Sequence, residues 1–536
     1  MRILLDAEQM RKCDNYTTEH FGISSVVLME RAALATFISI CNTGKMYEDS
    51  KTLIICGTGN NGADGLALAR IFFEGGYDAD FCVAFDEGRH SELYDRQLDT
   101  LSKYGLKPIS FSEIEDKYDI VIDAMFGIGL SRNLSEERIA AIEKLNSLSG
   151  FHVAMDIPSG INADTGAVMG AAFAADLTVT YGFAKKGMIL DPGRGYTGQL
   201  LIANIGITDR SLEAVEGPLF RVPETEDVVK TLPKRPVGGN KGTFGKVLIY
   251  AGSEKISGAC ALAGLAAFKA GAGMVKIITS EANADIVKKI LPEAMVTVTG
   301  LHNSAWADIK DDVKADIKDD VAWSDVILAG PGIGTGEEAR EVLALLADVS
   351  GDRPLVIDAD GLNIISADKE LREKIKNRSA LTVMTPHLGE LSRLTGLGIN
   401  KIKEDLCGEA ADFAGKENVI LVAKDSVSVV TDGSRSELIT SGNSGMATAG
   451  SGDVLSGIIA ALLGNIAGAK GVSAKTCKEE LFNAVRNAAY IHGMAGSACL
   501  EDMAEDSVTA GDIIAHLQSV IKDIRDEQKT KSKERV

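Results

Sequence analysis

The sequence predicts an α/β protein of two domains, each built on a mostly parallel β-sheet, the first of them doubly wound. Short apolar runs alternate with helical segments along most of the chain, which is typical of strand–helix–strand units. The length of 536 residues exceeds the roughly 250–300 residues at which a single core stops growing. The 56 glycines suit the many tight turns between strands and helices of such a fold.

The first half contains six segments that we expect to be strands. Several are continuous apolar runs, which indicates strands covered on both faces by helices in a parallel sheet. The segments are TLIICG (52–57), ADFCVAF (79–85), YDIVIDAMFG (118–127), FHVAMDIPSG (151–160), LTVTYG (177–182) and QLLIANIG (199–206).

A domain boundary is expected within 208–242, which is polar and proline-bearing and has no core pattern of its own. We assign 1–214 to the first domain, 215–234 to a linker and 235–525 to the second domain. A second α/β series then follows, with helical segments between the strands. Its expected strands are 246–253, 273–280, 325–334, 354–363, 381–390, 419–424 and 428–433.

Composition limits the class of ligand. The formal net charge of -20 disfavours nucleic acid, whose phosphates require a surplus of Lys and Arg. It does not disfavour a nucleotide, because backbone N–H groups and helix N-termini hold a small phosphate.

The eight cysteines show neither C-x-x-C nor paired spacing with histidine, which favours reduced thiols in a cytoplasmic protein. No stretch approaches the ~20 uninterrupted apolar residues of a membrane span. We expect no nucleic-acid or membrane partner, and a homo-oligomer.

A G-x-G-x-x-G turn at 57–62 lies between an expected strand and an expected helix, where a dinucleotide-binding loop belongs. A nicotinamide dehydrogenase also needs an acidic residue ~20 positions further on. Asp80 is near that position, but at the start of a strand rather than at its end. The inserted Asn60, Asn61 and Asp64 are foreign to that fingerprint, so a dehydrogenase is the second choice.

Oxygen ligands gather where the expected strands end. Asn61, Asp123 and Ser159 lie at or just after the carboxyl ends of three expected strands, and the carboxyl ends of parallel strands share the edge of the sheet at which ligands bind. Because only one of the three is a carboxylate, the set favours a weakly held monovalent cation over Mg²⁺ or zinc. The alternative is that Asp123 and Asp156 only cap the helices that follow.

Four long motifs then point to one family. They are GTGNNGADGLALAR (57–70), IDAMFGIGLSR (122–132), AMDIPSGINADTG (154–166) and TVTYGFAKKGMILDPG (178–193). Together with LMERAA (28–33) they resemble the NAD(P)H-hydrate epimerase family, which has a Rossmann-like fold, over nearly all of residues 1–210. The resemblance implies that the damaged, hydrated nicotinamide cofactor is the substrate and that Asn61, Asp123 and Ser159 bind potassium. It implies hydrate contacts from Asn60, Asn61, Gly62, Ala63, Asp64, Gly127, Ile128, Gly129, Leu130, Ser131, Arg132, Asn133 and Asp156.

Epimerisation inverts the carbon that bears the hydroxyl beside the ring nitrogen. Either the hydroxyl leaves and returns on the other face, or the ring opens and recloses, and both routes need a carboxylate near developing positive charge. Asp156 is our candidate for this catalytic group. We expect Lys185 and Lys186 to face solvent at the end of a strand. Ala63 stands where the family usually has a second glycine, and its methyl group would narrow the approach of the backbone to the hydrate.

In the second half, a glycine-rich turn at 449–453 leads directly into an apolar helix. Backbone N–H groups at such a helix start form an anion site that the helix dipole reinforces. Asp453, in the first helical turn, is then placed to accept a proton from a substrate hydroxyl. This arrangement resembles the ribokinase-like fold, whose members use that aspartate as a base.

Further motifs narrow the second resemblance: NKGTFGKVLIYAGS (240–253), GAGMV (271–275), AGPGIG (329–334), DADGLN (358–363) and TPHLGE (385–390). They resemble the ADP-dependent NAD(P)H-hydrate dehydratase family over about 235–520. The resemblance implies hydrate contacts from Ala259, Gly332, His387 and Asp453, and adenine-nucleotide contacts from Lys424, Asp425, Ser426, Val427, Ser428 and Gly452.

Two positions depart from the dehydratase pattern. Asp425 replaces a glycine and Ser428 a threonine, and a carboxylate beside a nucleotide lowers affinity unless it points to solvent. Taken alone, His387 has a structural alternative, as a core or turn residue whose hydrogen bonds are satisfied within the fold.

Together the resemblances imply a bifunctional repair enzyme. One half interconverts the R and S hydrates of NADH and NADPH, and the other dehydrates the S form with Mg²⁺ and ADP as phosphoryl donor, giving AMP and phosphate. One alternative is a vitamin-alcohol kinase on the same C-terminal fold, which would leave a stable phosphoester instead of regenerating reduced nicotinamide. The other is a nucleotide-sensing protein whose N-terminal half is inactive.

Overall fold

The computed structural model describes residues 1–86, 88–299, 306–470 and 478–533. The chain divides into two compact units, one formed by Arg2–Phe220 and the other by Met1 together with Arg221–Val536. Each unit is an α/β structure, which confirms the predicted fold class.

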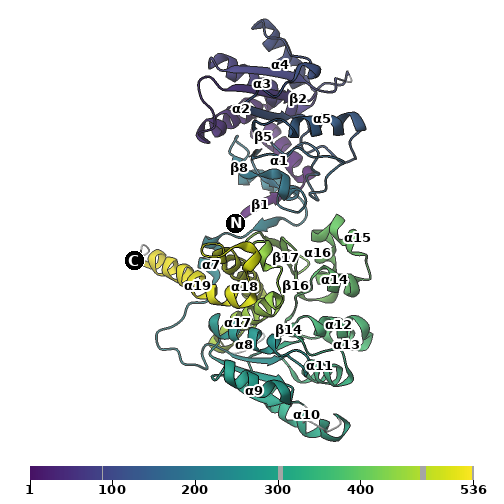
Figure 1. The fold of residues 1–536 in the computed structure, drawn as a ribbon, viewed down its shortest axis with the longest axis vertical. Helices are drawn as coiled ribbons and strands as arrows, with labels where there is room; N and C mark the ends of the chain where they lie inside the picture. Colours follow the sequence, from purple (N-terminus) through teal and green to yellow (C-terminus); the bar gives the residue numbers. More distant parts are fainter. Residues whose placement is uncertain (87, 300–305, 471–477, 534–536) are drawn as a thin grey trace. The chain divides into compact units, whose positions relative to one another are not determined.

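The sheet of the first unit is parallel throughout (Figure 1). All six strands predicted in this half are present, although most end before the apolar run does, because the last residues of each run form the loop at the carboxyl end. In spatial order they are β3 (Asp78–Val83), β2 (Lys51–Cys56), β4 (Ile120–Ala124), β5 (Phe151–Met155), β6 (Leu177–Tyr181) and β8 (Gln199–Ala203).

Helices cover both faces of this sheet, as the continuous apolar runs predicted. In β2, Ile54 and Cys56 pack against one helical layer, while Leu53 and Ile55 pack on the opposite side. The first layer contains α1 (Ala7–Glu19), α2 (Ser25–Asn42), α3 (Asn60–Glu74) and α4 (Glu92–Lys103), and the second contains α5 (Glu136–Asn146). Two short strands that the sequence did not predict, β1 (Arg2–Leu5) and β7 (Ala184–Lys185), pair in parallel in this unit.

The sheet of the second unit is parallel up to β16 and then continues through an antiparallel pair. Within this unit its order is β12 (Met295–Val298), β11 (Met274–Thr279), β10 (Lys246–Tyr250), β13 (Val326–Ala329), β14 (Leu355–Ile357), β15 (Thr382–Met384), β16 (Ile420–Ala423), β17 (Ser428–Thr431) and β18 (Ser436–Ile439). β12 and β18 were not predicted. The predicted strands 354–363 and 381–390 are strands only in part, because each turns into a helix, α12 (Asp360–Ala367) and α14 (Leu388–Thr395).

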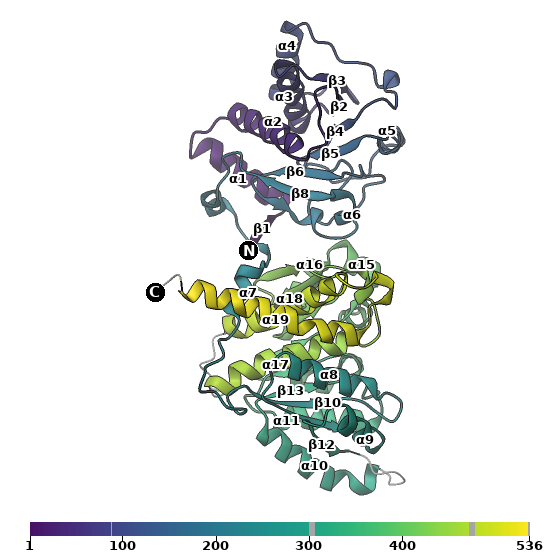
Figure 2. The ribbon, with the colours of Figure 1, turned by 60° about the vertical axis from the view of Figure 1, so that its left-hand side comes forward.

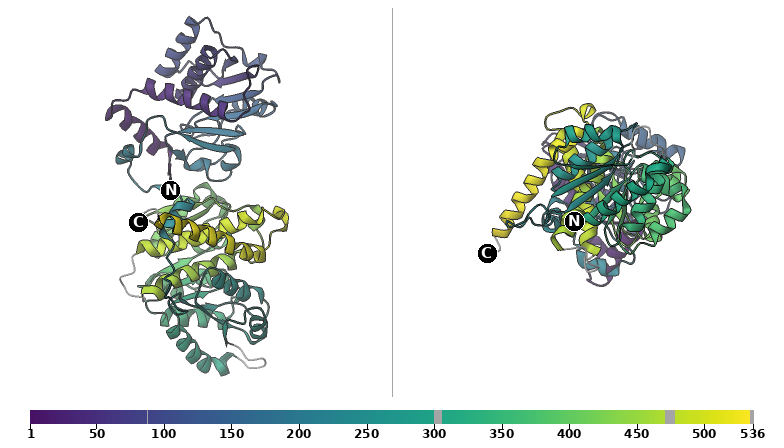
Figure 3. Two further views of the ribbon diagram at one scale, coloured as in Figure 1. Left: turned by 90° about the vertical axis from the view of Figure 1, so that its left-hand side faces the viewer. Right: turned by 90° about the horizontal axis from the view of Figure 1, so that it is seen from below.

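Four long helices cover one face of the second sheet (Figure 2). They are α8 (Gly258–Lys269), α17 (Ser451–Lys470), α18 (Lys478–Cys499) and α19 (Ala510–Lys533), and α19 runs along the others (Figure 3). α10 (Trp306–Trp323) and α11 (Glu337–Val349) lie on the opposite face (Figures 1 and 2).

The expected linker 215–234 is not an unstructured connection. It contains β9 (Phe220–Val222) and α7 (Thr225–Thr231), and Val228 and Val229 of α7 are buried in the core of the second unit. The polar composition hid this helix because a seven-residue helix needs only a few apolar side chains to dock. At the other end, α19 runs to Lys533, beyond the expected limit at 525.

Two of the described helices, α2 and α17, are long and apolar enough to cross a membrane by length and composition. In α17 this apolar stretch is 72% buried inside the protein, as in a core helix, whereas in α2 it is 33% buried. The expected absence of a membrane partner stays a prediction.

Candidate active sites

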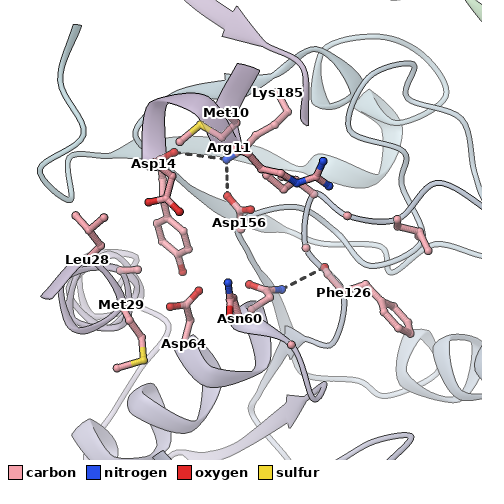
Figure 4. A pocket seen from close by; sticks show the side chains of 18 of the residues that line it. Met10, Arg11, Asp14, Leu28, Met29, Asn60, Asp64, Phe126, Asp156 and Lys185 are labelled. Atoms are coloured by element: carbon pink, nitrogen blue, oxygen red, sulfur yellow. Dashed lines mark hydrogen bonds and ion pairs between the residues drawn. The ribbon is translucent and has the colours of Figure 1, made fainter. Parts of the chain in front are cut away.

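The first unit contains a cavity of about 690 Å³ at the carboxyl ends of the parallel strands (Figure 4). Its walls come from α1, α2, the start of α3, the loop after β4 and the residues that follow β5 and β6. Of the residues predicted to contact the hydrate, those on this wall are Asn60, Asn61, Asp64, Gly127, Ile128, Gly129, Leu130, Ser131, Arg132 and Asp156.

Three predicted contacts, Gly62, Ala63 and Asn133, are not on the wall of this cavity. A Cβ at Gly62 would overlap the carbonyl of Gly57, so this glycine lets α3 start directly against β2. The Ala63 side chain is fully buried in the core between α3 and the sheet. The expectation that its methyl group narrows the approach to the hydrate is therefore wrong, because that methyl group faces the core. Asn133 is exposed.

The three predicted cation ligands lie around one loop. The Asn61 amide donates hydrogen bonds to the carbonyls of Phe126 and Met155, both at 3.2 Å, whereas its Oδ1 is buried and has no hydrogen-bond partner among the residues that the structure describes. The Ser159 hydroxyl donates to Asp123 Oδ1 at 2.7 Å and accepts from the Phe126 N–H at 2.9 Å. Burial raises the pKa of Asp123 to about 6, against the lowering effect of its hydrogen bonds from Ser159.

The alternative that Asp123 and Asp156 only cap helices is not what the structure shows. Asp123 accepts hydrogen bonds from the backbone N–H groups of Met125 and Ser159, and no helix starts after it until Glu136. Asp156 adopts a left-handed backbone conformation with φ 65° and turns its carboxylate to Lys185.

Lys185 corrects a prediction, because it does not face solvent. Its side chain is 1% exposed, and its ammonium group forms an ion pair with Asp156 Oδ1 and donates to Thr180 Oγ1 at 2.7 Å. Lys186 is not free in solvent either, since its ammonium group lies 4.5 Å from the centre of the Phe220 ring.

In the second unit, Asp453 lies in the first turn of α17, as predicted. Burial raises its pKa to about 7, repulsion from Asp358 adds to the rise, and Lys424 opposes it. Lys424 Nζ lies 3.0 Å from Asp358 Oδ1, and a Cβ at Gly452 would lie 3.2 Å from the same Nζ. The structure thus brings together three residues predicted for nucleotide and hydrate: Asp453, Lys424 and Gly452.

His387 lies beside this group and also has a structural role. Its backbone is bridged in parallel to that of Lys424, and its Nδ1 accepts the N–H of Gly389 at 2.9 Å at the start of α14. Burial and the charge of Lys424 lower the pKa of the imidazole. His387 therefore caps a helix and, with 55% of its side chain exposed, is still open to a ligand.

The remaining predicted contacts of the second unit fall into two groups. Ala259 and Gly332 are neighbours, because a Cβ at Gly332 would lie 3.1 Å from Ala259 Cβ. In the turn between β16 and β17, Asp425 and Ser426 are exposed while Val427 is buried. The Ser428 hydroxyl donates to the Asp425 carbonyl at 3.4 Å.

Comparison with known proteins identifies the family. Residues 247–519 match the family described as NAD(P)H-hydrate dehydratase, and residues 25–187 match the family described as YjeF-related protein N-terminus. The chain is 32% identical to the bifunctional NAD(P)H-hydrate repair enzyme of Thermofilum pendens, over 97% of this chain and 96% of that one. It is 33% identical to the enzyme of the same description from Moorella thermoacetica, over 98% of each chain. The chain belongs to the family of bifunctional NAD(P)H-hydrate repair enzymes.

Membership in this repair-enzyme family confirms the two resemblances, and with them the Rossmann-like and ribokinase-like folds of the two units. Among solved structures, the ADP/ATP-dependent NAD(P)H-hydrate dehydratase from Bacillus subtilis, co-crystallized with ATP/Mg²⁺, is 26% identical. It aligns with a TM-score of 0.46, over 57% of this chain and 98% of its own. The dehydrogenase alternative has no support in the structure, since Asp80 accepts the Tyr118 hydroxyl at 2.9 Å and is not on the cavity wall.

Sequence reasoning missed two carboxylates at these sites. Asp14 of α1 lines the cavity of the first unit; it follows the buried Cys13 and lies one turn after the buried Met10, so its position on the inner face of an amphipathic helix was a usable signal. Asp358 is 1% exposed and pairs with Lys424. It stands in the DADGLN motif, but a motif alone does not indicate which lysine a carboxylate will meet.

Proposed function

We propose that the first unit interconverts the R and S hydrates of NADH and NADPH, and that the second unit dehydrates the S hydrate to the intact cofactor using ADP. The relatives that this chain matches over nearly its whole length are described as bifunctional NAD(P)H-hydrate repair enzymes. The observation that carries the proposal is Asp453, a half-buried carboxyl at the start of α17 whose pKa is raised to about 7 and which lies within the field of Lys424.

The second unit supplies the groups that phosphoryl transfer needs. Asp453 takes the proton of the hydrate hydroxyl, whose oxygen then attacks the terminal phosphoryl group of ADP and releases AMP. Lys424 and the first N–H groups of α17 bind the phosphates, because a helix N-terminus favours negative charge. The phosphate ester breaks down as the lone pair of the ring nitrogen expels phosphate, and loss of a ring proton restores the reduced nicotinamide.

The turn at 424–428, which is exposed at Asp425 and Ser426, is the nucleotide contact in this proposal. The Asp425 side chain is exposed, and its Oδ1 accepts the N–H of Ser426 at 3.0 Å. A carboxylate held in this way remains hydrated, so its cost to nucleotide affinity is small.

Mg²⁺ would be bound mainly by the nucleotide phosphates and would neutralise their developing charge. Among the described residues, no group of three or more His, Cys, Asp or Glu is arranged to hold a metal ion. This fits a cation that keeps several waters and arrives with the nucleotide.

Potassium is proposed at Asn61, Asp123 and Ser159 of the first unit. The Oδ1 of Asn61, which no donor in the described part of the chain reaches, supports this, because a buried oxygen without a hydrogen-bond donor is costly unless a cation or a water satisfies it. Asp123 adds a single negative charge, and hard oxygen ligands of this kind suit a weakly held cation. The ion would fix the loop after β4, which forms part of the cavity wall.

The test is to supply both hydrate epimers to the full-length protein with ADP, Mg²⁺ and K⁺ and to follow the epimers, the reduced cofactor and AMP by chromatography. We expect both epimers to disappear, with reduced cofactor and AMP formed in equal amounts. Omitting ADP should leave only epimer exchange. Accumulation of a stable phosphoester would instead indicate a kinase, and unchanged hydrates with either ADP or ATP would refute the proposal.

A further inference from the structure

Three aspartates and one lysine approach the cavity of the first unit from different elements (Figure 4). Asp14 belongs to α1, Asp64 to the first turns of α3, Asp156 follows β5, and Lys185 belongs to β7. Asp156 and Lys185 form an ion pair with each other, and the Lys185 side chain is buried. The Asp156 carboxylate also accepts the Thr180 hydroxyl at 3.3 Å.

Asp156 is therefore poorly suited to move protons. Its carboxylate is already engaged by the Lys185 ammonium group and the Thr180 hydroxyl, and accepting a substrate proton would break the ion pair and leave the Lys185 charge buried without a counter-charge. Asp14 and Asp64 differ in this respect, since no hydrogen bond to either carboxylate is found among the described residues of this unit, and both lie on the cavity wall.

The surroundings give these two carboxyls unequal proton affinity. Burial raises the pKa of Asp14, and the charge of Asp156 raises it further while Lys185 lowers it. Burial also raises the pKa of Asp64, well above its usual range, and there both Asp156 and Asp14 add to the rise. Two carboxyls that share one low-dielectric site do not ionise together readily. The rise in pKa is larger at Asp64, so Asp64 keeps its proton to a higher pH than Asp14 does.

We propose that Asp14 and Asp64 are the acid–base pair of the epimerase, with Asp14 as the base and Asp64 as the acid. This assignment rests on the epimerase function proposed above and moves the catalytic role away from Asp156.

The reaction balances with these two groups alone. Asp14 takes the proton of the hydroxyl on the carbon beside the ring nitrogen, and the carbon–oxygen bond becomes a carbonyl. The bond between that carbon and the ring nitrogen breaks, its electron pair goes to the nitrogen, and the nitrogen takes the proton of Asp64. Rotation of the open-chain aldehyde presents its other face, and reclosure reverses both proton transfers to give the other epimer.

The Asp156–Lys185 pair then has a positioning role. It places one negative and one positive charge on the wall of the cavity that Asp14 and Asp64 also line. Arg11 also lines this cavity, and it belongs to α1, the helix that carries Asp14.

The test measures epimer exchange by chromatography in the full-length protein without nucleotide, so that dehydration does not interfere. The variants are Asp14→Asn and Asp64→Asn, and the control is Asp80→Asn, which keeps an acceptor for the Tyr118 hydroxyl and is outside the cavity wall. Hydrate binding is measured in parallel by calorimetry. We expect each cavity variant to lose 100-fold or more in kcat, with hydrate affinity within about threefold of wild type, and the control to keep wild-type exchange.

The outcomes separate this inference from the proposed function. Exchange within threefold of wild type in either cavity variant would overturn the acid–base pair, and so would a parallel loss of binding and turnover, which would make the residue a binding group. Because the two residues lie on different helices, a folding defect in one variant leaves the other as an independent test. Absence of exchange in the wild type itself would refute the epimerase function instead.

Discussion

The pH dependence of dehydration tests the role of Asp453 directly. Its carboxyl must be ionised to accept the proton of the hydrate, and its pKa of about 7 is set first by burial and then by repulsion from Asp358. Asp358→Asn removes that repulsion while keeping an oxygen that accepts the N–H of Ala359, as Asp358 Oδ1 does now at 2.9 Å. It also leaves Lys424 without its partner, which lowers the pKa of Asp453 further.

The size of the effect follows from the ionised fraction. With a pKa of about 7, roughly 1% of Asp453 is ionised at pH 5, so wild-type kcat/KM should fall there to about one hundredth of its plateau. A neighbouring charge changes a pKa by roughly 1–3 units, so the midpoint in Asp358→Asn should move to about 6 or below. At pH 5 the variant should then retain at least about a tenth of its own plateau.

The assay records kcat/KM for the S hydrate between pH 5 and 9 at saturating ADP and Mg²⁺, with each profile normalised to its own plateau. This normalisation removes any loss that arises because Lys424 binds nucleotide less well. Asp412→Asn is the control, since Asp412 pairs with Lys416 on the exposed side of α16 (Leu406–Glu417). A profile that stays flat down to pH 5, or a midpoint that Asp358→Asn leaves in place, would refute the assignment of Asp453 as the base.

Three further predictions concern residues whose positions the structure describes. Potassium at about 100 times its dissociation constant should stabilise the first unit by about 2.7 kcal/mol, measured by calorimetry against choline at equal ionic strength. Asn61→Ala should abolish this stabilisation. Equal stabilisation of the variant and the wild type would contradict the cation site. Ala63→Gly should lower stability by about 1 kcal/mol without changing the hydrate KM, because the methyl group faces the core. Asp425→Gly should change the ADP KM by less than about threefold, and a larger gain in affinity would show that the carboxylate faces the nucleotide.

Local sequence predicted the strands that carry their own signal. β2, β4 and β6 are buried on both faces and rich in β-branched residues, so they are recognisable without knowledge of their neighbours. The strands that were missed depend on a partner. β7 is two residues long and is a strand because β1, far away along the chain, pairs with it, and β12 exposes Met295 at the edge of its sheet.

The same distinction divides the site residues. Glycines and polar residues at strand ends, such as Gly62 and Asn61, follow from the tight turn that joins a strand to a helix, and this turn is a local property of the sequence. The raised pKa of Asp64 is not a local property, because it arises first from burial by other elements and then from the charges of Asp156 and Asp14. Motifs therefore predicted which residues surround the cavity but not which of them hold a proton.

Lys185 shows what sequence reasoning needs in order to do better. A lysine after a buried strand was assumed to reach solvent, since long charged side chains usually do. Here the backbone of Lys185 pairs with that of Leu5, which fixes Lys185 inside the unit. Lys185 follows β6, and β5, which pairs with β6, ends just before Asp156. A buried ammonium group is stable only with such a partner. A lysine that follows one strand should therefore be weighed against every carboxylate that follows the adjacent strands, and the order of strands in the sheet decides which carboxylate it meets.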